Sequence, residues 1–129
     1  MPMAPKKIIV TDVDGVLLNW EDAFQIWMEH QGNQRVKGHQ FIYNAAKQFD
    51  LTKGEGRKWV KLFNESAAIG FLPPLRDAQE IVSLLNNNYG YRFVVCTSLS
   101  KDKNAQELRT RNLKKLFGDV FEEIVYLDT

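Results

Sequence analysis

The sequence predicts an α/β fold, in which a Rossmann-like parallel sheet carries a small helical cap inserted after the first strand. Three apolar runs indicate strands, at residues 8–11, 91–97 and 124–127. The first run is β-branched and continuous, as in a strand that is buried on both faces. Helical patterns fill the intervals between the runs, and strands that alternate with helices favour a parallel sheet.

The interval between the first two strands predicts three helices. Asn19 can cap a helix that runs to about Gln31, and residues 41–49 are a second candidate. Thr52 and Glu55 have capping-box spacing for a third helix. The large aromatic residues of this interval are expected to form its core, with a base-stacking surface as the alternative: Trp20, Phe24, Trp27, Trp59 and Phe63.

The other elements are expected around the second and third strands. Pro73 and Pro74 close the helical interval, and a helix over residues 75–86 follows. A last helix begins after Ser100 and ends at Gly118. We therefore expect residues 1–18 and 73–129 to form the α/β core and residues 19–72 to form the cap.

Composition narrows the class of protein. The 129 residues are 44% hydrophobic and 26% charged, as in an ordinary globular domain. A net charge of +1 gives no strong sign of nucleic-acid or membrane binding. Cys96 is the single cysteine, which fits a reducing compartment, and no apolar stretch has the length of a membrane span. We expect a cytoplasmic protein.

Two acids and two hydroxyls follow the first two strands. Asp12 and Asp14 come at the end of the first strand, and Thr97 and Ser98 at the end of the second. In parallel sheets ligands bind beyond the carboxyl ends of the strands, so these side chains are expected at one rim. Alternate residues of an extended chain point to opposite sides, and Gly15 allows the bend that brings both acids onto one ligand.

The residue types suggest a chemistry for this rim. Two poorly solvated carboxylates repel each other, and an oxygen-rich site that holds them as anions suits Mg²⁺. One carboxylate could attack an electrophile and form a covalent intermediate, while the other donates and accepts protons. A hydroxyl of Thr97 or Ser98 could hold a tetrahedral anion. The alternatives are a plain Asp-Gly turn and an ordinary strand end or helix cap at Thr97-Ser98.

The stretch DVDGVL, residues 12–17, resembles the first motif of the haloacid-dehalogenase-like (HAD) superfamily, and VVCTS, residues 94–98, resembles its second. The resemblance implies a magnesium-dependent phosphohydrolase. Asp12 would become an aspartyl-phosphate, Asp14 would be the general acid/base, and Thr97 would bind the phosphoryl group, beside Ser98 and Gly15. Asp12 and Asp14, the latter through its backbone carbonyl, would hold the metal. The small helical cap is most similar to that of deoxyribonucleotidase-type members.

The chain departs from the family pattern at its second half, where a third-motif lysine and a fourth-motif acidic pair are not found. We therefore expect a fragment of a longer phosphatase, with weak or no activity and weak magnesium binding in the 129 residues alone. A catalytically inactive binding or regulatory module is the alternative. A small phosphate ester, with a nucleoside monophosphate as candidate, is the expected partner. The first strand would lie at a sheet edge and favour self-association.

Overall fold

The computed structural model describes residues 6–39, 42, 44 and 46–127. Within them lies a three-stranded parallel sheet of order β1-β2-β3, formed by β1 (Ile8–Thr11), β2 (Arg92–Thr97) and β3 (Phe121–Tyr126). Ile9 pairs with Phe93, and Val95 pairs with Ile124. A mixed α/β fold with a parallel sheet is therefore confirmed, and β1 forms one edge of the sheet in the described part of the chain.

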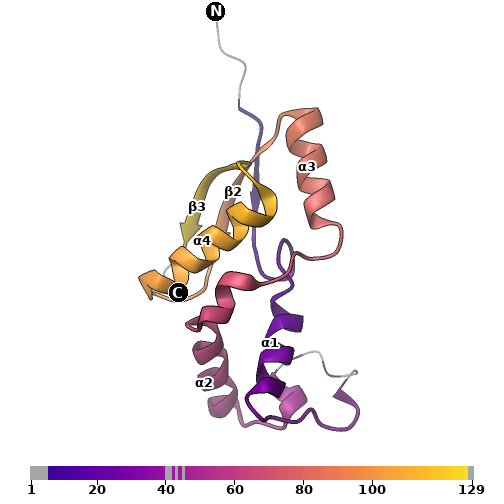
Figure 1. Ribbon diagram of the computed structural model, residues 1–129, viewed down its shortest axis with the longest axis vertical. Helices are drawn as coiled ribbons and strands as arrows, with labels where there is room; N and C mark the ends of the chain where they lie inside the picture. The colour runs from indigo at the N-terminus through magenta and orange to yellow at the C-terminus, as the bar shows by residue number, and fades with distance from the viewer. Residues whose placement is uncertain (1–5, 40–41, 43, 45, 128–129) are drawn as a thin grey trace, which may run out of the picture.

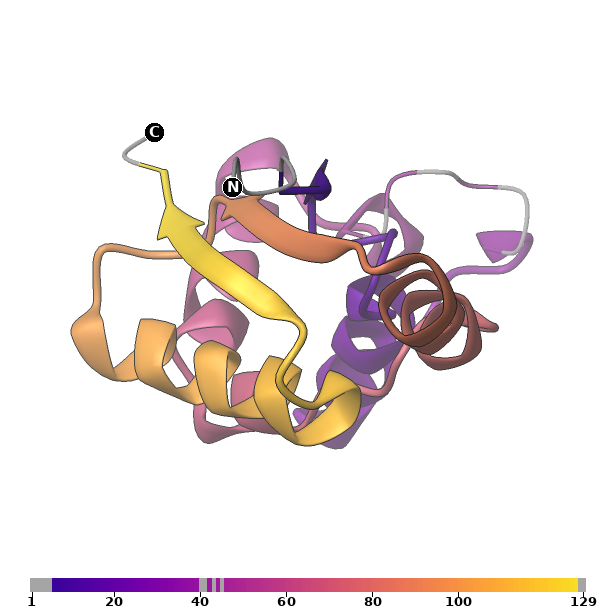
Figure 2. The same cartoon turned by 90° about the horizontal axis from the view of Figure 1, so that it is seen from above.

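Two helices belong with the sheet: α3 (Ala78–Tyr89) and α4 (Lys103–Phe117). Both views place α4 against one face of the sheet, with α3 beside it (Figures 1 and 2). On β2 the side chains of Phe93, Val95 and Thr97 are buried on this face, whereas those of the alternating residues are half-buried. The core of the sheet layer thus lies between the strands and α4.

The segment between β1 and α3 is helical and lies beyond the carboxyl ends of the strands (Figure 1). It contains α1 (Trp20–His30), the short 3₁₀ helices η2 (Ala46–Phe49) and η3 (Ala67–Phe71), and α2 (Lys53–Asn64). The chain enters and leaves it side by side, because the Asn19 amide donates to Pro73 and the Leu75 amide donates to Leu17. These two bonds fix the helical segment on the rim of the sheet.

Two helix starts in this segment confirm the sequence predictions. The Asn19 side chain accepts a hydrogen bond from the Asp22 amide at the start of α1. Thr52 and Glu55 form a complete capping box at α2, with both bonds 3.2 Å long. Of the helix predicted over residues 41–49, Ala46–Phe49 form the 3₁₀ turn η2, residues 42 and 44 are not helical, and residues 41, 43 and 45 lie outside the described residues.

Aromatic rings form the interior of the helical segment. Phe24 and Phe63 are fully buried, and the ring of Trp20 stacks on Phe24 with centroids 4.8 Å apart. Trp27 meets both Trp59 and Phe63 at 5.8 and 5.3 Å. Because these rings contact one another, the expectation of an aromatic core is confirmed over that of a base-stacking surface.

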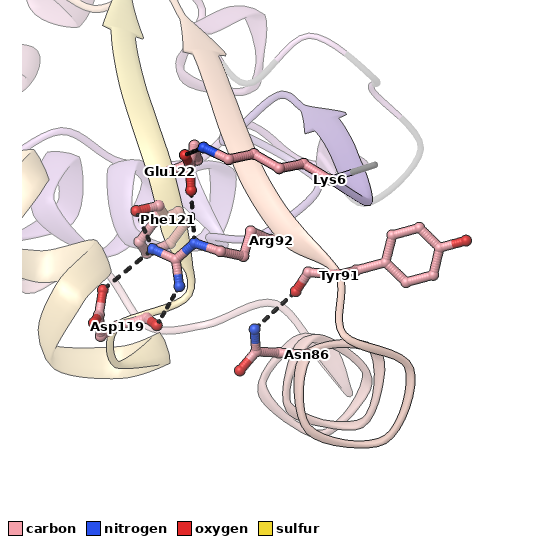
Figure 3. Close-up of polar contacts among 7 residues, drawn as sticks. All are labelled: Lys6, Asn86, Tyr91, Arg92, Asp119, Phe121 and Glu122. Carbon is pink, nitrogen blue, oxygen red and sulfur yellow. Dashed lines mark hydrogen bonds and ion pairs between the residues drawn. The ribbon is translucent and has the colours of Figure 1, made fainter. Parts of the chain in front are cut away.

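A polar cluster fixes the amino end of the sheet (Figure 3). The Arg92 Nε donates to Glu122 at 2.8 Å, and its Nη2 donates to the Phe121 carbonyl at 2.8 Å. Lys6 forms a second ion pair with Glu122, and the pKa of that carboxyl is lowered, first by Lys6 and then by Arg92. These contacts join Lys6, which precedes β1, to the first residues of β2 and β3.

Three predicted boundaries are wrong by three residues. The helix predicted over residues 75–86 ends at Tyr89, and it begins at Ala78 because the Leu75 amide is bonded to Leu17 and Asp77 adopts φ +67°. On this helix Ala78 and Val82 are buried, whereas Ile81 is exposed. The third strand begins at Phe121 rather than residue 124, since the exposed Glu122 and Glu123 belong to it although they interrupt the apolar pattern.

Candidate functional site

The turn after β1 places the two acids of the first motif. Val13 is fully buried, and its carbonyl accepts the amides of Val16, Leu17 and Leu18 at 2.9–3.1 Å. Gly15 adopts φ +77°, a conformation that other residues rarely enter, so the predicted bend at this glycine is confirmed. The buried Val13 anchors the turn, with an acid on either side of it.

Asp12 is the exposed acid of the pair. One of its carboxylate oxygens, Oδ1, accepts the amide of Val13 at 2.7 Å, which fixes the carboxylate against the start of the turn. For its other oxygen the structure shows no hydrogen bond from any residue that it describes. Asp12 thus presents a carboxylate oxygen to solvent beyond the carboxyl end of β1.

Asp14 is held by an arginine that the sequence analysis did not select. Arg109 of α4 is 0% exposed, and its guanidinium donates to both carboxylate oxygens of Asp14, at 2.6 and 3.2 Å. Nη1 of Arg109, which forms the longer of these two bonds, also donates to the Thr97 hydroxyl at 3.0 Å. Arg109 therefore joins the end of β2 to the turn after β1, and the predicted meeting of residues 14 and 97 at one rim is seen.

Burial and charge act in opposite directions on Asp14. The pKa of its carboxyl is raised above the ordinary 3.8, chiefly by burial. Arg109 opposes this rise, and the nearby Asp12 carboxylate adds a little to it. Within the described residues the Arg109 Nε is buried without a hydrogen-bond partner, so the guanidinium is not fully satisfied.

The two hydroxyls of the second motif differ in access. Thr97 is 1% exposed and accepts from Arg109, so it faces the interior beneath Asp14. Ser98, one residue further, is exposed. Of these two hydroxyls, that of Ser98 is therefore the accessible one, whereas that of Thr97 positions Arg109.

The oxygen atoms of Asp12 and Asp14 show whether the residues present fit the Mg²⁺ that the resemblance implies. The Asp14 carboxylate is occupied by Arg109, and no group of three or more acidic, His or Cys side chains suited to a metal occurs in the described residues. The Asp12 carboxylate and the Asp14 carbonyl remain, and these are the two ligands that the resemblance implies. They fit part of a six-oxygen shell, so waters or other groups would supply the rest.

The position of Arg109 in the sequence is a pattern from which its burial could have been inferred. It lies on the stripe of α4 that also contains the buried Ala105, Asn112 and Leu113. A charged residue at helical spacing within a buried stripe requires a buried partner. The stripe therefore pointed to an ion pair, although it did not identify Asp14 as the partner.

Comparison with known proteins does not identify a family or an activity for this chain. No family model matches the chain. The chain is 30% identical over 127 residues to an uncharacterized 32.4 kDa protein encoded in the Gp30-rIII intergenic region of Enterobacteria phage T4. The match includes 93% of this chain but only 44% of the phage protein, so the chain spans less than half of that relative. None of the helices among the described residues has the length and apolarity needed to cross a membrane.

Proposed function

We propose that this chain is part of a phosphomonoester hydrolase of the HAD type and carries its nucleophile, Asp12. The observation that carries the proposal is the accessible Asp12 carboxylate beyond β1, beside an Asp14 that is linked through Arg109 to Thr97. Exposed acids are common, but an exposed acid beside a half-buried, fixed one at the carboxyl rim of a parallel sheet is a typical catalytic arrangement. The helical segment beyond this rim would act as the cap, and a nucleoside monophosphate is the candidate substrate.

The chemistry follows from the positions of the two acids. A carboxylate oxygen of Asp12 attacks phosphorus, and the bond from phosphorus to the ester oxygen breaks. Asp14, in its protonated form, gives a proton to the leaving oxygen, and then takes a proton from the water that attacks the aspartyl-phosphate and releases inorganic phosphate. A pKa raised by burial suits a proton donor, and Mg²⁺ bound by Asp12 and the Asp14 carbonyl would neutralise phosphoryl charge.

An inactive binding module is the second candidate, and the same ion pair favours it. A carboxylate held by two hydrogen bonds to Arg109 is less free to exchange protons than a solvated one. The two candidates differ in turnover but share a phosphate-binding rim. Activity, rather than binding, therefore separates them.

The test is hydrolysis of p-nitrophenyl phosphate and a panel of nucleotides in the presence of Mg²⁺. The longest natural polypeptide that contains these 129 residues should be used. We expect Asp12→Asn to remove nearly all turnover without changing the circular dichroism spectrum, a loss of at least about 100-fold. Asp22→Asn, which alters an exposed acid on α1, is the matched control. Substantial turnover by the Asp12 variant would exclude it as nucleophile, and an inactive wild type would favour the binding module.

A further inference from the structure

A cavity of about 1080 Å³ lies between α2 and the loop that follows β2. Residues 99–102 form one wall, and the other comes from α2 and the segment before it. Leu99 is only two residues beyond Thr97, so the cavity begins next to the rim that carries the candidate site. Asp12, Asp14 and Thr97 are not among the described residues that line it, so the cavity adjoins the candidate site and is distinct from it.

The lining of the cavity is strongly basic, although the net charge of the chain is only +1. The described lining residues include five cations and two carboxylates, an excess of three positive charges. The cations are Lys47, Lys53, Arg57, Lys61 and Lys101. The lining therefore has a larger net positive charge than the chain as a whole.

The two carboxylates of the lining are engaged elsewhere. Glu65 accepts a hydrogen bond from the Ser100 hydroxyl at 2.9 Å, which ties the end of α2 to the loop. Asp102 accepts the Asn104 amide at 3.3 Å and caps α4. Both carboxylates therefore have structural roles, and within the described part of the chain neither forms an ion pair with a cation of α2.

Three of the cations, Lys53, Arg57 and Lys61, form a basic ridge. They are spaced four residues apart, so they lie on one face of α2, and all three are exposed. No ion pair joins them to any residue that the structure describes. Like charges at this spacing destabilise a helix, and an anion bound along the ridge would relieve that repulsion.

The geometry points to a phosphate-terminated single strand of nucleic acid as the ligand of this cavity. Lys53 and Lys61 are eight residues apart, or about 12 Å along a helix that rises 1.5 Å per residue. Successive phosphates of an extended single strand are about 6–7 Å apart, so that length matches two to three successive phosphates, and it exceeds what the clustered phosphates of one nucleotide require. The apolar Leu51, Val60 and Leu99 in the same lining offer surface for bases.

The orientation of α2 connects this ligand to the candidate site. The end of α2 lies nearest the loop after β2, as the Glu65–Ser100 bond shows, and its start lies farther out (Figure 1). A strand along the ridge would place its terminal phosphate toward the rim of the sheet and its preceding nucleotides toward Lys53. This inference rests on the proposed function for the role of the terminal phosphate, but binding along the ridge does not require turnover.

Binding is tested by fluorescence anisotropy with a labelled single strand of about ten nucleotides, phosphorylated at the 3′ or the 5′ end. The buffer contains EDTA, so the result does not depend on hydrolysis. We expect Lys53→Gln/Lys61→Gln to weaken binding at least about tenfold at low salt and to reduce the slope of log K against log salt by about 1.4. Lys114→Gln/Lys115→Gln, the matched double change on the last turn of α4, should have little effect.

Three outcomes would overturn the inference. The first is no measurable binding, and the second is an equal loss in both double variants, which would indicate attraction to charge in general. The third is equal competition by a nucleoside triphosphate, which would favour clustered phosphates over a strand. Binding that depends on the ridge in a protein without phosphatase activity would retain this inference and reject the proposed function.

Discussion

A single buried arginine connects the two motifs of the candidate site. Arg109 is 0% exposed, and its two bonds to Asp14 and one to Thr97 use both terminal nitrogens of the guanidinium. The Asp14 side chain remains 34% exposed, so this pair lies at the boundary between interior and solvent. Burial disfavours the ionised carboxylate there and the arginine favours it, and burial is the larger effect on its pKa.

The raised pKa of Asp14 predicts how stability depends on pH. Because the folded pKa lies above the unfolded value of about 3.8, the folded chain holds the proton more tightly. The stabilisation is complete below about pH 3.8 and is lost as pH rises through the folded pKa. Asp14→Asn lacks this proton, so the stability of the wild type relative to the variant should fall over that window. Urea unfolding of both proteins from pH 3 to 7 measures the difference.

A second variant separates the two opposing effects on Asp14. Arg109→Met removes the interaction that lowers the pKa of Asp14, so that pKa should rise further in a carboxyl NMR titration. Asp22→Asn serves as the control for the unfolding series. A wild type that gains stability over the Asp14 variant as pH rises would show that the attraction of Arg109 outweighs burial, and the predicted direction of the pKa shift would be wrong.

At the scale of single residues, the sequence identified the candidate residues of the site more readily than the contacts between them. Asp12, Asp14 and Gly15 could be selected because strand, acids and glycine are adjacent in the chain. The pairing of Asp14 with Arg109 spans 95 residues, and no local pattern encodes such a contact. The burial of Thr97 follows from the alternation of β2, which buries Phe93 and Val95 on the same face, whereas its hydrogen bond from Arg109 was not visible in the local sequence.

At the scale of elements, one close contact attaches the helical segment to the sheet layer. η3 packs on α4 so tightly that a Cβ at Gly70 would lie 3.1 Å from Leu108. Beside it, Asn112 of α4 accepts the Leu72 amide at 3.0 Å and donates to the Leu72 carbonyl at 3.2 Å. The side chain of Asn112 is buried and replaces the backbone partners that Leu72 lacks where the chain leaves η3.

We predict that Asn112→Ala destabilises the protein by about 2–4 kcal/mol, because the Leu72 amide and carbonyl both lose their buried partner. Urea unfolding gives the free energy, and hydrogen exchange should accelerate at the Leu72 amide. Asn88→Ala, an exposed change on α3, should cost less than about 0.5 kcal/mol. Equal small effects for the two variants would show that Asn112 does not join the two parts.

Helix ends were predictable where capping residues determine them, and less so where tertiary bonds do. Asn19, Thr52 and Gly118 mark ends that the structure confirms, since each acts on its own helix. The start of α3 depends instead on the bond from the Leu75 amide to Leu17, far away in the chain. In the same way, β3 includes two glutamates because Glu122 pairs with Lys6 and Arg92.

At the scale of the whole molecule, the residues that the structure describes cover one face of the sheet. The pairing register and alternation place Val10, Val94, Cys96 and Val125 on the face opposite α4. These residues do not belong to the core cluster, which includes the buried Phe93 and Val95 of the other face, with the partly buried Ile9 and Ile124 packed against it. Parallel sheets are ordinarily covered on both faces, so this apolar surface is available for another layer.

The edge of the sheet adds to this exposed surface. β1 pairs only with β2 among the described residues, and its Val10 is 66% exposed. An apolar edge strand with unpaired backbone groups tends to pair with another chain. Lys6 and Lys7, which would oppose such pairing, are already engaged with Glu122 and with the Tyr89 carbonyl. The edge and the open face meet at Val10.

We therefore predict that the 129-residue chain self-associates through β1, and that Val10→Lys reduces this association. A lysine at this position would be buried in a contact of the open face, which is costly for an unpaired charge, and a lysine on an edge strand also disfavours pairing with another chain. Val16→Lys is the matched control, because Val16 is an exposed valine of the turn after β1. Sedimentation equilibrium over a wide concentration range should show association in the wild type and the control, and a shift toward monomer in Val10→Lys. A wild type that stays monomeric throughout would mean that this edge does not support pairing, and equal association of both variants would place the contact elsewhere on the molecule.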